Sequence, residues 1–244
     1  MSRFVSPVRS HPRHILASTA VALALTVSTA SAFLPGAALA QSTATDVTGT
    51  PAAQTCVMDS NNVPEAAASA GAVYTLDSTA STASYSVQEV LTGQGDVNAV
   101  GTTNALIGTI LLDESGAPIP CSVVYVDLRT LTTDEDRRDN QVQKVLETST
   151  YPLGTFIVTG VEGLDGALND GQEHTFTIIG ELTIHGVTKQ TAWEATAKVD
   201  GDTMTGTATT TITFGDFGME APVFGPVASI EDEFQLSIDL TATT

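Results

Sequence analysis

The residues on either side of Gly186 alternate between apolar and polar, and this pattern constrains the fold of the 244-residue chain more than any other feature. On one parity the apolar residues are Phe176, Ile178, Leu182 and Ile184 before the glycine, and Trp193, Ala195, Ala197 and Val199 after it. Because successive side chains of a strand point to opposite faces, each stretch predicts a strand with one apolar face. Gly186 permits a positive φ, so we expect a tight turn there.

Similar alternation recurs along the chain. We expect further strands at 73–77, 83–91, 100–112, 121–128, from 156 onward, 204–214 and 234–240, with a turn-rich segment at 93–98 and a loop at 160–172. Gly101 and Gly108 break the strand at 100–112, and we expect the barrel wall to bend there. Eight or nine long antiparallel strands with one apolar face favour closure into a barrel, which leaves no exposed edge. The sequence thus predicts an all-β protein, an antiparallel β-barrel of about eight strands; a flattened sandwich is the alternative.

One helix is predicted, from Thr133 to about Glu147. Thr133 can cap it, residues 134–136 are all acidic, and Lys144 lies near its end. Its apolar residues Val142, Val145 and Leu146 are spaced i, i+3 and i+4, which forms one narrow stripe. We expect this stripe to lie across one mouth of the barrel.

The first 40 residues are typical of an export signal. Three arginines without acids precede an apolar run of about thirteen residues, 15–27, and small residues end at Ala40. We expect cleavage after Ala40, with the alanines at 30 and 32 marking a competing site. The run is shorter than the roughly 20 residues of a membrane-spanning helix. The prediction is therefore a periplasmic or extracellular protein without stable membrane insertion, with a flexible leader at 41–71 and the barrel domain at 72–244.

The charge of the chain is strongly negative, at −19. Without residues 1–40, six basic residues remain against 28 acidic ones, a net charge of −22. Such a surface repels phosphate backbones, so no nucleic-acid partner is expected. In an exported chain Cys56 and Cys121 are candidates for a disulfide; the alternative is two unpaired thiols.

Candidates for catalysis and metal binding are few. Beyond the signal the only histidines are His174 and His185, and no Gly-x-Ser-x-Gly, P-loop or dinucleotide motif is present. The acidic cluster at 134–139 does not match a calcium loop, and the histidine spacing does not match a zinc site. We expect no enzyme activity, no metal and no cofactor, and we interpret His185 as a hydrogen-bonded structural residue.

Two charged residues are out of pattern. Glu89 falls on the apolar parity of its strand, which indicates either a bulge, the interpretation we favour, or a carboxylate that points inward. Arg138, beside Asp139, could orient a ligand headgroup, or it could form an ion pair that fixes the helix to the barrel. The ion pair is the commoner outcome for such a residue.

Several motifs in this order resemble one known family. They are Arg138-Asp139, Tyr151-Pro152-x-x-x-Phe156, Leu182-Thr183-Ile184-His185-Gly186-Val187-Thr188 and Asp216-Phe217-Gly218. Together they are similar to the YceI-like family of exported, lipocalin-like β-barrels, over residues 74 to about 240. The chain departs from the family after Asp77 and at Phe214-Gly215, so the resemblance speaks for binding of a tail and not for a shared headgroup contact.

The resemblance implies a polyisoprenoid-binding or related protein. Its partner would be an isoprenoid, a quinone or another lipid-like molecule whose tail lies in an apolar tunnel, and a homodimer is possible. The candidate tunnel residues are Tyr85, Phe156, Phe176, Ile178, Leu182, Ile184, Trp193, Phe234, Leu236 and Ile238. Two alternatives remain: an interaction module with a barrel filled by side chains, and a small hydrolase or isomerase that uses His185.

Overall fold

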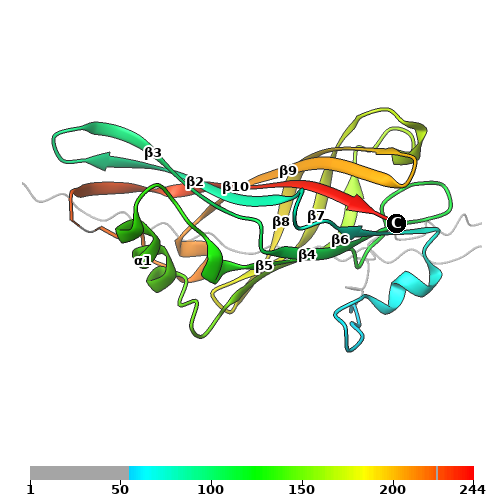
Figure 1. Ribbon diagram of the computed structural model, residues 1–244, viewed down its shortest axis with the longest axis horizontal. Helices are drawn as coiled ribbons and strands as arrows, with labels where there is room; N and C mark the ends of the chain where they lie inside the picture. Colours follow the sequence, from blue (N-terminus) through cyan, green and yellow to red (C-terminus); the bar gives the residue numbers. More distant parts are fainter. Residues whose placement is uncertain (1–54, 224) are drawn as a thin grey trace, which may run out of the picture. The chain divides into compact units, whose positions relative to one another are not determined.

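A computed structural model describes residues 55–223 and 225–244 (Figure 1). The predicted signal at 1–40, both candidate cleavage sites and the first part of the leader lie outside these residues. The described strands are β1 (Ala72–Leu76), β2 (Thr82–Leu91), β3 (Gly95–Thr103), β4 (Leu106–Leu112), β5 (Val123–Asp127), β6 (Leu153–Glu162), β7 (His174–Ile184), β8 (Val187–Asp200), β9 (Thr203–Thr213) and β10 (Val227–Thr243).

Eight of these strands close an antiparallel barrel. The order runs from β1 through β4, β5, β6, β7, β8 and β9 to β10, and pairing of β1 with β10 completes the ring. The 17-residue β10 is long enough to pair with β9 along most of its length and with both β1 and β2 on its other side. The predicted all-β barrel of about eight strands is confirmed, and the sandwich alternative is wrong.

The hairpin of β2 and β3 extends this barrel at one end, which we call the mouth. β2 pairs with the first part of β10 and with β3, and β3 is the last strand in the sheet order (Figure 1). Two predicted boundaries were wrong here. Residues 95–98 belong to β3 and not to a turn, and the expected strand 100–112 breaks at Asn104-Ala105 and not at its glycines.

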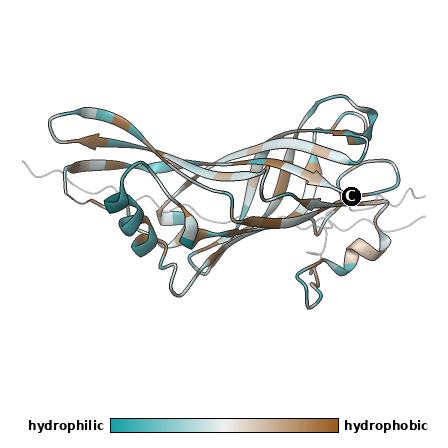
Figure 2. Ribbon diagram, viewed as in Figure 1, coloured by the Kyte–Doolittle hydropathy of each residue, from teal (hydrophilic) through white to brown (hydrophobic). Residues whose placement is uncertain are grey.

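The single α-helix of the described residues, α1 (Asp136–Val145), lies beside the β2–β3 hairpin (Figure 1). It starts later than predicted. Its N-cap residue is Glu135 and not Thr133, and Glu135 makes no side-chain cap bond. Thr133 instead donates its hydroxyl to Asp139 at 2.6 Å, which ties the chain before the helix to its first turn. Figure 2 shows that α1 is hydrophilic along most of its length, as its narrow apolar stripe requires.

β7 and β8 form the hairpin that the alternation predicted. Ile184 pairs with Val187, so the turn consists of His185 and Gly186 alone. Both residues have positive φ, 53° and 73°, which is the conformation of a type I′ hairpin turn. The glycine was expected to adopt it, whereas His185 adopts it at the cost of some strain.

Two predicted loops contain more structure than the sequence indicated. The described part of the expected leader, 55–71, contains a 3₁₀-helix at Glu65–Ser69. The candidate disulfide between Cys56 and Cys121 is present, with 5.4 Å between their Cα atoms. The expected loop at 160–172 is shorter, because β6 continues to Glu162 and a short 3₁₀-helix spans Leu168–Asp170.

Candidate functional site

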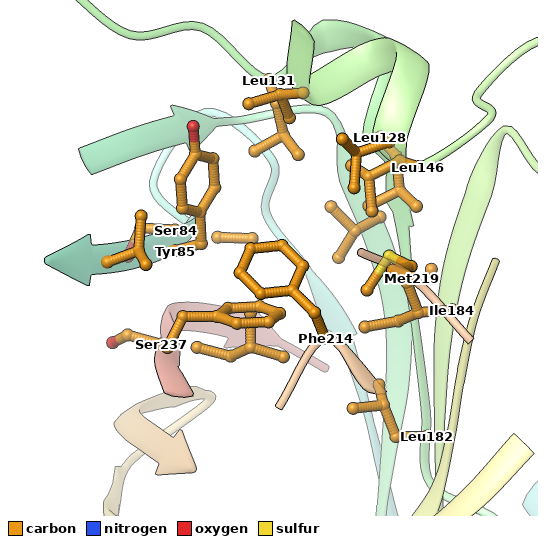
Figure 3. A pocket seen from close by; sticks show the side chains of 18 of the residues that line it. Ser84, Tyr85, Leu128, Leu131, Leu146, Leu182, Ile184, Phe214, Met219 and Ser237 are labelled. Atoms are coloured by element: carbon orange, nitrogen blue, oxygen red, sulfur yellow. The ribbon is translucent and has the colours of Figure 1, made fainter. Parts of the chain in front are cut away.

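The mouth of the barrel holds a cavity of about 140 Å³, which we call the mouth cavity. Its lining residues come from β2, β5, β6, β7, β8 and β10, from α1, and from the segments that follow β5 and β9. A single water needs roughly 10–15 Å³ measured in this way, so the cavity can hold a sizeable part of an organic molecule. Figure 3 shows its walls, which consist mainly of carbon.

Eight of the ten predicted tunnel residues line this cavity. They are Tyr85, Phe156, Leu182, Ile184, Trp193, Phe234, Leu236 and Ile238. Each lies on the inward parity of its strand, which is why alternation alone was enough to select them. Trp193 is 2% exposed, and its ring lies 5.1 Å from that of Phe156, so these two aromatic residues form a packed wall.

The helical segment covers the cavity on one side. Val142, Val145 and Leu146, the predicted apolar stripe, line the cavity together with Leu128 and Leu131 from the segment between β5 and α1. In Figure 3 the three leucines lie together next to the helical ribbon. The helix therefore serves as an apolar cover, although most of its surface is polar.

Some lining residues were missed by the sequence analysis. Phe214 and Met219 lie in the irregular segment between β9 and β10, where no periodicity marks which side chains point inward. Phe214 packs on Phe234 with 4.6 Å between the rings. Phe214 continues the apolar parity of β9 by one residue beyond the end of the strand. This was the one signal in the sequence that could have identified Phe214 as a lining residue.

The polar end of the cavity is an ion-pair network. Glu89 is 2% exposed and accepts a hydrogen bond of 2.7 Å from Nη2 of Arg138, while Nη1 of Arg138 binds Asp134. The favoured interpretation of Glu89 as a bulge was wrong: its carboxylate points inward. The register shift lies opposite, in β10 between Ile230 and Phe234. Arg138 fixes the helix to β2, as the ion-pair interpretation predicted, and it also lines the cavity.

Tyr85 lies against β3 at the same end. It pairs with Gly101, where a Cβ atom would lie 2.2 Å from Cε1 of the ring, so only glycine leaves room for the ring. Gly101, expected to mark a bend in the barrel wall, thus provides space for Tyr85. Burial raises the pKa of Tyr85, and its hydroxyl has no hydrogen-bond partner among the described residues.

The other two predicted tunnel residues, Phe176 and Ile178, lie elsewhere. They line a second cavity of about 60 Å³ toward the opposite end of the barrel, which we call the far cavity. Its walls include the small residues Ala195, Ala197, Gly206 and Ala208. The ten predicted tunnel residues are therefore divided between two cavities of the described barrel, whereas a single tunnel was expected.

His174 and His185, the two histidines of the described residues, line neither the mouth cavity nor the far cavity. Nδ1 of His185 donates a hydrogen bond of 3.1 Å to the carbonyl of Phe217, and its ring packs edge-on against Tyr151. Nε2 of His174 lies 3.0 Å from a carboxylate oxygen of Asp170, and this hydrogen bond raises the pKa of His174. These contacts connect loops to strands, as expected for structural residues.

Within 55–223 and 225–244, no group of three or more His, Cys, Asp and Glu residues is arranged to hold a metal ion. In the same residues, no helix has the length and apolar character needed to cross a membrane.

Curated relatives match part of this barrel. A UPF0312 protein of Pseudomonas putida strain W619 is 32% identical over 111 residues, which are 41% of this chain and 54% of that protein. Protein YceI of Escherichia coli O6:H1 strain CFT073 is 32% identical over 104 residues, 42% of this chain and 50% of that protein. The chain spans about half the length of these relatives.

Two solved structures share the fold. BcnA of Burkholderia cenocepacia superposes with a TM-score of 0.53 at 20% identity, covering 69% of this chain and 99% of that one. A polyisoprenoid-binding domain from Saccharophagus degradans gives a TM-score of 0.54 at 17% identity, covering 70% and 98%. The model of the YceI-like domain matches residues 74–242, which is more than half of the chain and the whole barrel except its outermost residues. The protein therefore belongs to the YceI-like domain family.

Proposed function

We propose that this protein is an exported, non-enzymatic binding protein for a polyisoprenoid or a similar long-chain amphiphile. The mouth cavity is the observation that carries this proposal. Strands on several sides of the barrel contribute its apolar walls. The charged lining residues, Glu89 and Arg138, are confined to one end. A cavity of this kind suits a ligand with an apolar tail and one polar end.

The class of ligand follows from the cavity and from the family. Burial of an apolar chain yields about 25 cal/mol per Å² of surface removed from water, so a hydrocarbon tail is the natural occupant of such walls. The neighbour from Saccharophagus degradans is described as a polyisoprenoid-binding domain, which supports an isoprenoid or a quinone with an isoprenoid tail. A barrel filled with side chains is disfavoured, because two cavities remain in its interior.

The histidine contacts support a role without catalysis. A general base must reach its substrate within hydrogen-bond distance, directly or through one water. His185 lines neither cavity, and its Nδ1 is engaged with the carbonyl of Phe217. A hydrolase or isomerase built on His185 would therefore need a substrate outside both cavities.

The test is to identify what the purified protein carries. Native mass spectrometry and organic extraction of the mature protein should reveal a bound amphiphile, or uptake of an added prenyl quinone, prenyl phosphate or fatty chain. Val145→Trp should block the cavity from the helix and abolish this binding. Lys144→Trp, on the exposed side of the same helix, is the matched control and should retain it. A wild-type protein that takes up none of these molecules would overturn the proposal.

Export is tested separately. Expression of the full chain in a bacterium, followed by cell fractionation and N-terminal sequencing, should give a periplasmic or secreted protein that begins after residue 40. A protein that remains in the cytoplasm with an intact N-terminus would overturn the export proposal and leave the binding proposal standing.

A further inference from the structure

Two buried polar atoms in the described residues have no hydrogen-bond partner: Oη of Tyr85 and Nε of Arg138. Both residues line the mouth cavity, at the end that also contains Glu89. A buried polar group without a partner costs about 1–3 kcal/mol, so native proteins leave few of them. Two at the same end of one apolar cavity indicate a site that a bound molecule completes.

Both atoms are available as donors. The N–H at Nε of arginine can only donate, and the other two nitrogens of Arg138 already bind Glu89 and Asp134. Burial raises the pKa of Tyr85, so its hydroxyl keeps its proton over the physiological range and can donate as well. The complementary group on a ligand is therefore an oxygen that accepts hydrogen bonds.

The local charge discriminates between kinds of oxygen. Arg138 is opposed by two carboxylates in direct contact, Glu89 and Asp134. The positive charge is thus more than compensated before any ligand binds. A phosphate or carboxylate headgroup would be repelled and would lose its hydration at the same time, whereas an uncharged oxygen has neither cost.

We propose that Tyr85 Oη and Arg138 Nε form a headgroup site for an uncharged carbonyl oxygen, such as that of a quinone, an ester or an amide. This inference rests on the proposed function, because the same ligand places its tail in the mouth cavity. It adds the chemical class of the headgroup, and it selects against isoprenoid phosphates.

The experiment compares three ligands with the same isoprenoid tail: a prenyl quinone, the prenyl diphosphate and the prenyl hydrocarbon. Binding to the mature protein is measured by fluorescence competition or calorimetry. We expect the quinone to bind about tenfold more tightly than the hydrocarbon, because it adds one to two net hydrogen bonds. The diphosphate should bind more weakly than the quinone.

Variants separate the headgroup from the tail. Tyr85→Phe removes one donor and keeps the ring, and Arg138→Lys keeps a cation opposite Glu89 and removes Nε. Each should weaken quinone binding about five- to tenfold more than it weakens hydrocarbon binding, because only the quinone accepts the lost hydrogen bond. Tyr125→Phe is the matched control, since Tyr125 lines neither cavity, and it should change neither affinity.

Thermal unfolding of the ligand-free protein gives a second readout. Tyr85→Phe should leave the melting temperature unchanged or raise it, because the lost hydroxyl has no partner, whereas a structural hydroxyl would lower it when removed. The inference is overturned by equal affinity for quinone and hydrocarbon, by tighter binding of the diphosphate, or by a lowered melting temperature of Tyr85→Phe. Failure of all three ligands to bind would instead overturn the proposed function, and the headgroup site with it.

Discussion

The two cavities of the barrel share the strands β6, β7, β8 and β10, yet they differ in size and in construction. The mouth cavity has large apolar walls, a helical cover and an ion-pair network, whereas the far cavity has less than half its volume and is lined partly by alanine and glycine. Trp193 lies on the mouth side and Ala195, the next inward residue of β8, on the far side. The change from a large to a small side chain within one strand thus marks the border between the two cavities.

The largest expected effect comes from removing that border. Trp193→Ala deletes a buried ring and its hydrogen bond to Thr191, so the free energy of unfolding should fall by about 5 kcal/mol, the upper end for such truncations. The two cavities should then join, and the variant should prefer longer tails than the wild type does. Denaturant unfolding and competition between tails of different length measure both effects, with Trp193→Phe as a control that keeps the border. Unchanged tail preference would show that Trp193 does not limit the site.

A second change acts on the far end alone. Replacement of Cys56 and Cys121 by serine opens a loop of 65 residues, which the chain-entropy model values at about 4 kcal/mol of stability. Ser122, next to Cys121, lines the far cavity, so ligand binding at the mouth should be unaffected. Urea titration and ligand affinity of the folded double variant test this separation. A parallel loss of affinity would mean that the two ends are coupled.

A third change acts on the mouth alone. Glu89→Gln leaves Arg138 with only the exposed carboxylate of Asp134, and the free energy of unfolding should fall by about 3 kcal/mol, because a buried charge loses its partner. Arg129→Gln breaks the exposed pair with Asp127 and should have little effect. Chemical denaturation of both variants provides the comparison. Equal losses would mean that the Glu89 pair behaves like a surface pair.

The smallest expected effect is a pH dependence at the far end. The hydrogen bond to Asp170 raises the pKa of His174 above its ordinary value, so the folded protein binds this proton more tightly than the unfolded chain does. The resulting stabilisation is complete below the unfolded pKa of about 6.5 and is lost as the pH rises through the folded value. His174→Gln should remove this part of the dependence of the melting temperature on pH. An unaltered profile would exclude the contribution.

Sequence alternation predicted the barrel and eight residues of the mouth-cavity wall because both depend on the same physical rule, the two-residue period of strands. The rule fails where a residue owes its place to a distant partner. Glu89 faces inward because Arg138 meets it there, and Gly101 makes room for a ring from the neighbouring strand. The residues next to Glu89 and Gly101 in the sequence do not indicate that Arg138 and Tyr85 are their partners.

The same limit explains why Phe214 and Met219 were missed and why the predicted tunnel residues are divided between two cavities. Phe214 and Met219 precede and follow a short 3₁₀ turn, Gly215–Phe217, where side-chain direction follows from loop geometry and not from a repeat. Alternation also gives no measure of depth, so Phe176 and Ile178 were grouped with residues that line a different cavity. Sequence pattern thus predicts which face a residue occupies more reliably than how far along the barrel it lies.

The edge position of β3 has a consequence for how a ligand enters. β3 pairs with β2 but has no second strand partner in the described part of the chain; a bridge from Thr102 to Thr132 is its pairing on the other side. On this side of the mouth, α1 is therefore held by its ion pair with Glu89 of β2 and not by a ladder of backbone hydrogen bonds to β3. We expect a lateral port at this place: outward movement of the helix would open a route from solvent to the cavity while all eight strands of the ring keep their pairing.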